Sequence, residues 1–263
     1  TINEFPLFAW LNGDLHAHMT MTPFLLLGAA LAFALYRTPG SEPRRRRLLL
    51  FGAVPLVGGF QVVLDTWSFP SVFGLAWLAL AAAPAPPRTL LPASLRRPLD
   101  MRLSSGDDDS TRLHTELTRP VVAAALVAGA GLLALAVAAP FLLVAVAGGG
   151  SERELAVLPV EMRSSLGGLL VVHGAFLATF FAGLLGAVGR ERPVAVVAGI
   201  VALALAGIGV GLPALGLFGT LLIAGWVALR ADRAGFETVL IVGGAGLALV
   251  VELVYLNEQA GPG

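Results

Sequence analysis

Long apolar runs separated by short polar segments make up most of this sequence. A transmembrane helix needs about 20 consecutive, mostly apolar residues, and roughly 17–25 are tolerated. By this measure eight segments are predicted to cross a membrane, namely residues 20–37, 47–64, 68–84, 120–147, 165–188, 193–211, 213–230 and 236–256. The pattern therefore predicts an all-α fold, a polytopic bundle of about eight transmembrane helices forming a single domain over residues 1–263.

Prolines, a short connection and a long polar segment interrupt the apolar pattern. Thr22-Pro23 and Ser68-Phe69-Pro70 both resemble a helix start with proline in the first turn, which leaves short apolar stretches behind them. The first and third helices are therefore candidates for re-entrant segments as well as for spans. Only "GLPAL" separates the sixth run from the seventh, which predicts a tight hairpin. Residues 85–119, which contain "SSGDDDS", are predicted to be a flexible cytoplasmic loop.

Composition supports a membrane protein. The chain is 57% hydrophobic and 13% charged, with a mean hydropathy of +0.84, whereas soluble domains carry about 25% charged residues. The net charge is zero, which argues against a polyanionic partner such as nucleic acid. The absence of cysteine excludes disulfides, thiolate catalysis and cysteine-ligated zinc.

The arginines predict the orientation. Fifteen of the seventeen basic residues fall in the loops that follow the first, third, fifth and seventh runs, and only Arg153 and Arg163 fall in the others. Because positively charged loops stay in the cytoplasm, both ends of this segment are predicted to lie outside it, in a multi-pass cell-membrane protein.

This orientation places most other unusual polar residues near the outer surface. "NGDLHAHMTMTPF" precedes the first run and carries Asp14, His16 and His18. In an extended chain these three side chains share one face, whereas in a helix only Asp14 and His18 do. They are candidates for a divalent metal site or for an acid/base pair. The alternative is a solvated turn in which Asp14 caps a helix.

Further candidates lie at other outer boundaries. Asp65 and Trp67 form a candidate substrate-binding pair, the alternative being a solvated acid beside an interfacial tryptophan. Glu252 lies inside the last apolar run, where a lone carboxylate is costly, so it is a catalytic candidate or one half of a buried ion pair with an arginine. Tyr255 and Arg163 are candidate substrate-binding residues. His173, about two turns into the fifth run, is predicted to be a hydrogen-bonded packing residue.

The first motif resembles the signature of the YYY multispanning membrane protein family of archaea and Chloroflexi. The family typically reads N-E-F-P-x-F-x-F-L-x-G-D-L-H-P-H, and this chain departs from it with Ala17 in place of proline. The matching residues are Asn3, Glu4, Phe5, Pro6, Gly13, Asp14, Leu15, His16 and His18. "LDTWSFPS" is similar to the family's N-x-W-D-x-P-T, with Trp67 and Pro70 kept, but with Asp65 and Ser68 where asparagine and aspartate are usual.

The resemblance implies a longer protein, of which these residues form an internal portion, and a fold similar to that of GT-C membrane glycosyltransferases. Such enzymes transfer sugars from polyprenyl-phosphate-linked donors at the outer membrane surface. On this hypothesis Asp14 is the base or a metal ligand and His16 and His18 bind metal or stabilise the leaving phosphate. Trp67 stacks on a sugar.

Two alternatives remain. The first is a non-enzymatic membrane subunit or a transporter, which a polar path through the bundle would favour; the fourth, sixth and seventh apolar runs contain no ionisable residue in their cores. The second is a zinc hydrolase, since D-L-H-x-H also occurs in soluble phosphoesterases, but here a membrane span follows the motif.

Overall fold

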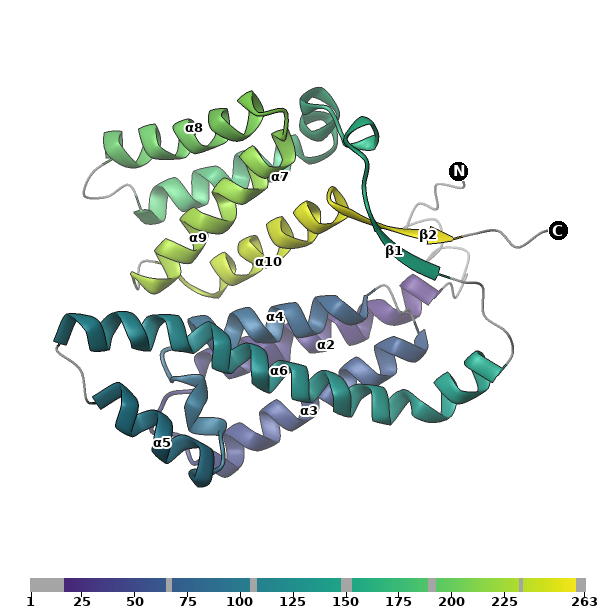
Figure 1. Ribbon diagram of the computed structural model, residues 1–263, viewed down its shortest axis with the longest axis vertical. Coiled ribbons are helices and arrows are strands. Elements are labelled where there is room, and N and C mark those ends of the chain that lie inside the picture. The colour runs from purple at the N-terminus through teal and green to yellow at the C-terminus, as the bar shows by residue number, and fades with distance from the viewer. Residues whose placement is uncertain are drawn as a thin grey trace. The chain divides into compact units, whose positions relative to one another are not determined.

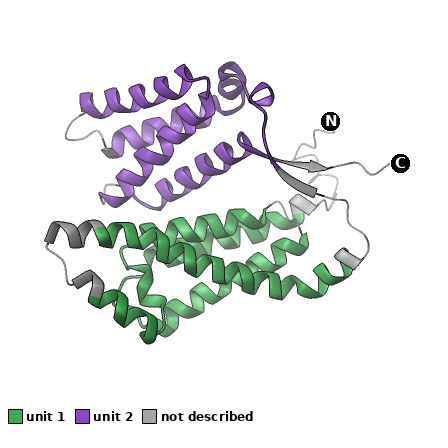
Figure 2. Ribbon diagram, viewed as in Figure 1, with its two compact units in different colours: residues 1–148 green, residues 149–263 purple. Residues whose placement is uncertain are grey.

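The computed structural model describes residues 17–64, 68–104, 108–147, 153–188, 193–231 and 234–258. The chain divides into two compact units, unit 1 over residues 1–148 and unit 2 over residues 149–263 (Figure 2). The predicted single domain thus contains two units, each of which is described by itself below.

Unit 1 is a helical bundle. Its four main helices are α2 (Ala17–Arg37), α3 (Arg44–Leu64), α4 (Phe69–Ala82) and α6 (Asp108–Ala147), all visible in Figure 1. The chain reverses direction between α2 and α3 and again between α3 and α4, so that consecutive helices are antiparallel neighbours. Helix α6 packs against both α3 and α4. The indole Nε1 of Trp77 on α4 donates a hydrogen bond of 2.9 Å to the carbonyl of Pro120 on α6.

The bundle has two chemically different ends. One end, here called the Arg-rich end, contains the end of α2 at Arg37, the start of α3 at Arg44 and the segment after α4. The opposite end, here called the motif end, contains the start of α2, the end of α3 and the start of α4. Arg37 and the arginines 44–47 lie at the first of these ends, and the side of the membrane that this end faces stays a prediction.

The connection between α4 and α6 is more ordered than predicted. Residues expected to form a flexible loop include the 3-10 helix η1 (Pro87–Leu90), helix α5 (Ala93–Ser104) and the first turns of α6. An ion pair of 2.9 Å between Arg88 Nε and Asp100 Oδ1 joins η1 to α5. The 40 residues of α6 correspond to a helix about 60 Å long, twice the roughly 30 Å of a bilayer core, so its polar first turns extend past the apolar layer.

Unit 2 contains four helical segments of its own. These are α7 (Leu166–Val188), α8 (Pro193–Gly209), α9 (Thr220–Arg230), which continues from the π-helical turn η3 (Leu215–Gly219), and α10 (Phe236–Val251). The predicted hairpin between the sixth and seventh runs is confirmed. Gly211 turns the chain there with φ of +79°, a left-handed conformation that glycine adopts without steric cost.

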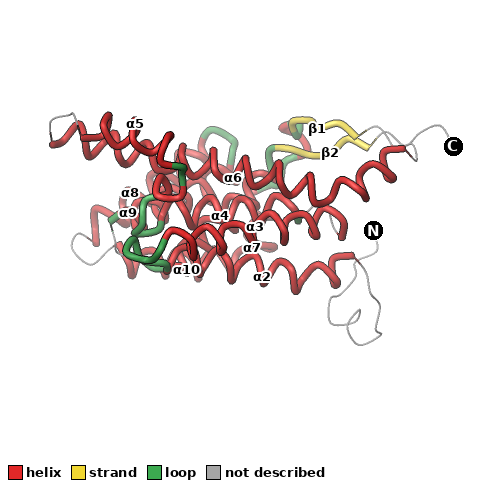
Figure 3. Tube along the Cα trace, turned by 90° about the horizontal axis from the view of Figure 1, so that it is seen from below, coloured by secondary structure: helices red, strands yellow, loops and turns green. Residues whose placement is uncertain are grey.

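A short β-ribbon joins the beginning of unit 2 to its end, and helices form nearly all the rest of the described chain (Figure 3). Strand β1 (Arg153–Val157) pairs antiparallel with β2 (Val254–Glu258), with Val157 opposite Val254 and Arg153 opposite Glu258. The 3-10 helix η2 (Val160–Met162) follows β1. The prediction of a helical span to residue 256 is wrong at its end, because α10 stops at Val251 and the chain then becomes extended.

The helices support an all-α membrane-type bundle. Four are long and apolar enough to cross a membrane by length and composition: Thr20–Arg37, Arg44–Leu64, His114–Val144 and Leu166–Ala187. The other predicted spans form shorter apolar helices of 10–17 residues, so the count of eight stays a prediction. Large apolar side chains on the helix surfaces, such as Val171 at 86% exposure and Leu132 at 70%, fit a lipid environment.

The two proline signals had different outcomes. Ser68 is the N-cap residue of α4 and proline lies in its first turn, as predicted. The same interpretation of Thr22-Pro23 is wrong, because α2 already begins at Ala17 and Pro23 lies inside the helix. The first run is consequently longer than its proline suggested.

Candidate functional site

Five of the predicted site residues lie, in the sequence, at or next to the helix ends that form the motif end of unit 1, and the other three belong to unit 2. Asp14, His16, Asp65 and Trp67 lie outside the described residues. His18 lies in the first turn of α2, so the backbone is already helical there, although its side chain is also outside the description. The metal site predicted from Asp14, His16 and His18 therefore stays a prediction. Within the described part of the chain, no three His, Cys, Asp or Glu side chains are grouped as metal ligands.

A buried polar contact connects the helix ends that adjoin these motifs. Gln61 on α3 is 0% exposed, and its Nε2 lies 3.7 Å from the sulfur of Met21 on α2. Met21 is three residues after His18, and Gln61 is four residues before Asp65. Both spacings correspond to about one helical turn, so the two motif-bearing helix ends lie side by side.

Gln61 is also incompletely paired. Its Oε1 has no hydrogen-bond partner among the described residues, and an unpaired buried amide oxygen costs about 1–3 kcal/mol. Sequence reasoning missed Gln61, although a single amide in the apolar run 47–64 is a visible signal. Buried polar groups without partners concentrate where a ligand, water or strain has a role.

Glu252 belongs to unit 2, where it connects the end of α10 to the segment before α7. It is the C-cap residue of α10 and is partly buried. Its Oε2 accepts a hydrogen bond of 2.9 Å from the backbone N–H of Ser164, and its Oε1 accepts one of 2.7 Å from the Ser164 hydroxyl. The carboxylate thus anchors the end of α10 to the residues just before α7, and its partner is a serine instead of the arginine considered from the sequence.

The remaining two candidates flank this anchor. Arg163 donates a hydrogen bond of 3.3 Å from Nε to the carbonyl of Leu158, which stabilises the turn between β1 and α7. Tyr255 pairs with Ala156 in the β-ribbon, and its side chain lies outside the described residues. Ser165 completes the region, because its Oγ accepts the N–H of Gly168 at 3.2 Å and caps α7.

Removing the Glu252 carboxylate is expected to lower the stability of unit 2. Hydrogen bonds to charged groups contribute about 1.5–3 kcal/mol, so Glu252→Ala is expected to reduce the free energy of unfolding by about that amount. Thermal unfolding in detergent, followed by circular dichroism, measures the change. Glu161→Ala is the matched control, because Glu161 is an exposed carboxylate in the same region.

The double variant Ser164→Ala/Glu252→Ala tests whether the two residues act together. If they do, its loss of stability is smaller than the sum of the two single losses. Strict additivity would contradict the anchor.

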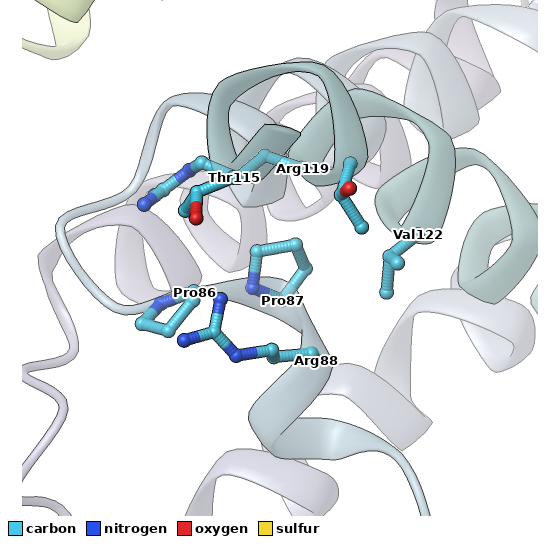
Figure 4. A pocket seen from close by; sticks show the side chains of 7 residues that line it. Pro86, Pro87, Arg88, Thr115, Arg119 and Val122 are labelled. Carbon is cyan, nitrogen blue, oxygen red and sulfur yellow. The ribbon is translucent and has the colours of Figure 1, made fainter. Parts of the chain in front are cut away.

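The surface between η1 and α6 in unit 1 is a structural contact and offers no ligand site. Residues 86–88 face Thr115, Arg119 and Val122 (Figure 4), but the space between them does not admit a water molecule. Arg119 is 9% exposed and donates from Nε to the carbonyl of Ala81 at 3.2 Å and from Nη2 to the carbonyl of Ala83. A cation there stabilises the carbonyl end of α4.

Arg47 and Arg44 also stabilise this region, through hydrogen bonds to η1. It is 5% exposed and donates to the hydroxyl of Thr89, while Arg44 donates to the carbonyl of Leu90 at 3.0 Å. These arginines, which were used above to predict the orientation in the membrane, therefore also hold the segment between α4 and α5 in place through hydrogen bonds.

Comparison with known proteins gives one match. A family model described as "Uncharacterized membrane protein (DUF2298)" matches residues 1–263. No curated protein and no solved structure matches the chain. Since the family model covers the entire sequence and the fold is a membrane-type helical bundle, the chain belongs to this family of multi-pass membrane proteins, DUF2298.

Proposed function

We propose that this chain is part of a membrane glycosyltransferase of the GT-C type, which transfers a sugar from a polyprenyl-phosphate-linked donor at an extracytoplasmic site. The observation that carries the proposal is the contact between Met21 and Gln61. It holds the helix ends next to "GDLHAH" and "LDTWS" side by side, at the end of unit 1 opposite the arginines. The described helix ends that adjoin these two motifs in the sequence thus lie at one end of the bundle.

The proposed chemistry follows from the residue types. Asp14 is the base or a metal ligand, and His16 and His18 bind a divalent metal or stabilise the leaving phosphate. A metal ion would supply Lewis-acid stabilisation of the phosphate. Trp67 stacks on a sugar ring, and Asp65 contacts the sugar.

Glu252 enters the proposal as a positioning residue, because both of its oxygens accept hydrogen bonds from Ser164. Membrane lipid surrounds the helices, and both ends of this segment lie outside the cytoplasm, as the positive-inside rule indicates.

The alternative is a non-enzymatic subunit or a transporter, which a polar path through the helices would favour. In the described part of unit 2, the buried polar side chains are Thr220 and Thr238. The Thr220 hydroxyl donates within its own helix segment to the carbonyl of Gly216, at 2.5 Å. These features give less support to a path than to a site at one end.

Replacing Asp14 by asparagine is expected to abolish most sugar transfer, because the amide neither accepts a proton nor binds a divalent metal well. General-base catalysis contributes about 10²–10⁴-fold, so turnover should fall by at least about 100-fold. The assay uses the full-length protein in its membranes with radiolabelled polyprenyl-phosphate-linked hexoses, with and without a chelator.

Two histidine variants distinguish loss of a site residue from a general loss of folded protein. His16→Asn is expected to reduce turnover, whereas His114→Asn should not, because His114 is exposed in the polar first turns of α6 at the Arg-rich end. Unchanged turnover in Asp14→Asn would remove Asp14 from the mechanism. Absence of transfer by the wild-type protein from every polyprenyl-phosphate donor would contradict the function itself.

A further inference from the structure

Unit 2 contains an apolar cavity within its own helices. Its volume is about 170 Å³ and it lies between α7, η3 and α10. The lining residues are His173, Phe176, Leu177, Phe180, Phe218, Gly244, Ala245 and Ala248. Phe218 reaches the cavity from the π-helical turn η3, an irregularity that is often found at functional positions.

The size and lining of the cavity restrict its occupant. A cavity of about 150 Å³ lined by aliphatic and aromatic side chains stays dry and binds a group the size of benzene. The present cavity is similar in volume, and histidine is the only lining residue with a polar side chain. A sugar or a phosphate group would lose most of its hydrogen bonds there, at a substantial cost in free energy. A short piece of hydrocarbon chain has the matching size and polarity.

His173 gives the cavity one polar contact point. Its ring meets Phe218 edge-on, with centroids 5.4 Å apart and an interplanar angle of 84°. This contact agrees with the prediction of a packing residue, but the predicted hydrogen bond is not found, because neither ring nitrogen has a hydrogen-bond partner within the described part of the chain. A neutral imidazole offers one donor and one acceptor, so an oxygen-bearing group next to the hydrocarbon would satisfy it.

His173 lies in the first half of α7. His173 is seven residues after Leu166, the first residue of α7, which places it roughly 10 Å along the helix from its start. Two lining positions are also open at the surface, since Phe176 is 63% exposed and Gly244 is exposed. A hydrocarbon chain in the surrounding bilayer can therefore reach the cavity laterally.

We propose that this cavity binds the first segment of a membrane-lipid hydrocarbon chain and that His173 hydrogen-bonds to an oxygen of the same lipid. Straight acyl chains and isoprenoid chains share this chemistry. Lipid binding here uses only residues of unit 2 and does not depend on the proposed sugar transfer.

Photolabelling of the full-length protein in phosphatidylcholine nanodiscs tests the site. One arm contains phosphatidylcholine with a diazirine near the head of its acyl chain, and the other contains a polyprenyl phosphate with a diazirine on its first isoprene unit. Peptide mass spectrometry locates the label. We expect at least one probe to label the α7 and α10 residues that line the cavity, and the arm that labels them identifies the source of the chain.

Two glycine variants make the test specific. Gly244 lines the cavity, and a Cβ there meets nothing within 4 Å. Gly244→Leu is therefore expected to occupy part of the cavity and reduce labelling about tenfold, the effect of about 1.4 kcal/mol. Gly183→Leu on α7 is the matched control, because Gly183 is exposed, does not line the cavity and has equally open space. Its labelling should equal that of the wild type.

His173→Phe keeps the ring and removes both nitrogens. One hydrogen bond corresponds to roughly a three- to tenfold change in affinity, so labelling should fall by about that factor in competition with unlabelled lipid. Equal labelling of the wild type and Gly244→Leu would show only general lipid contact and overturn the proposal. Failure of both probes to label the cavity would overturn it as well. Photolabelling does not require sugar transfer, so the proposed lipid site and the proposed transferase function can each fail without the other.

Discussion

Gly207→Ala is expected to lower the stability of unit 2 sharply, although alanine is normally the better helix former. A Cβ on Gly207 would overlap the Cα and N atoms of Gly216, and a Cβ on Gly216 would lie 2.5 Å from the carbonyl oxygen of Ala204. The neighbours on both sides are backbone atoms, which cannot move aside as a side chain does. Overpacking costs about 1–3 kcal/mol and occasionally more, so we expect a loss of about 3 kcal/mol.

The control for this substitution lies on the same helix and has the opposite expected sign. Gly199 also belongs to α8, but a Cβ there meets nothing within 4 Å. Gly199→Ala should leave the melting temperature unchanged or raise it, because alanine is favoured over glycine in helices by up to about 1 kcal/mol. Circular dichroism during heating in detergent compares the two. Equal melting temperatures for both variants would show that α8 and η3 do not pack through their backbones.

Arg119→Leu is expected to have a comparable effect on unit 1. The guanidinium group donates to the carbonyls of both Ala81 and Ala83 at the end of α4. Hydrogen bonds from charged groups contribute about 1.5–3 kcal/mol each, and loss of the donor leaves the carbonyls unpaired. We therefore expect a reduction of about 3 kcal/mol in the free energy of unfolding, measured by thermal or denaturant unfolding in detergent.

Two further variants separate geometry from charge. Arg119→Lys should restore the stability only in part, because a lysine ammonium lacks the planar fork that reaches two acceptors at once. Arg45→Leu removes an exposed arginine from the start of α3 and should change the stability by less than about 0.5 kcal/mol. If Arg119→Lys is as stable as the wild type, the charge alone is sufficient and the two-carbonyl geometry is unimportant.

Helices were the part of the fold that the sequence predicted well. Apolar runs of bilayer length depend only on local composition, so α2, α3 and α7 appear close to their predicted ranges, and α6 ends where predicted but begins twelve residues earlier, at Asp108. The hairpin at Gly211 was also predictable, because a glycine and a proline, two residues that favour turns, lie close together between two apolar runs. Arginine placement correctly indicated one charged end in unit 1.

The features that the sequence missed depend on contacts between distant segments. Strand β1 pairs with β2 about one hundred residues later, and neither segment alone carries a strong strand pattern. Helix α5 is ordered through Arg88 and Asp100, which lie in a segment that composition indicated to be flexible. The role of Glu252 likewise depends on Ser164, a residue 88 positions away.

The candidate site was predicted unevenly for a related reason. Motif residues such as Asp14 and His16 attract attention because their types suggest chemistry. An amide or an imidazole in an apolar run, such as Gln61 or His173, is visible in the sequence, but its role becomes clear only when its neighbours in the fold are known. Met21 and Phe218 provide that information here.

The β-ribbon also sets an order of events during synthesis. Val157 and Val254 are opposite each other in the ribbon, yet the ribosome must add about one hundred residues after the first before the second exists. At about 5–20 residues per second, β1 waits roughly 5–20 s without its partner strand. All of α7, α8, α9 and α10 are translated during this interval. Pairing of β1 with β2 is therefore a late step, which closes unit 2 only after its helices have been made.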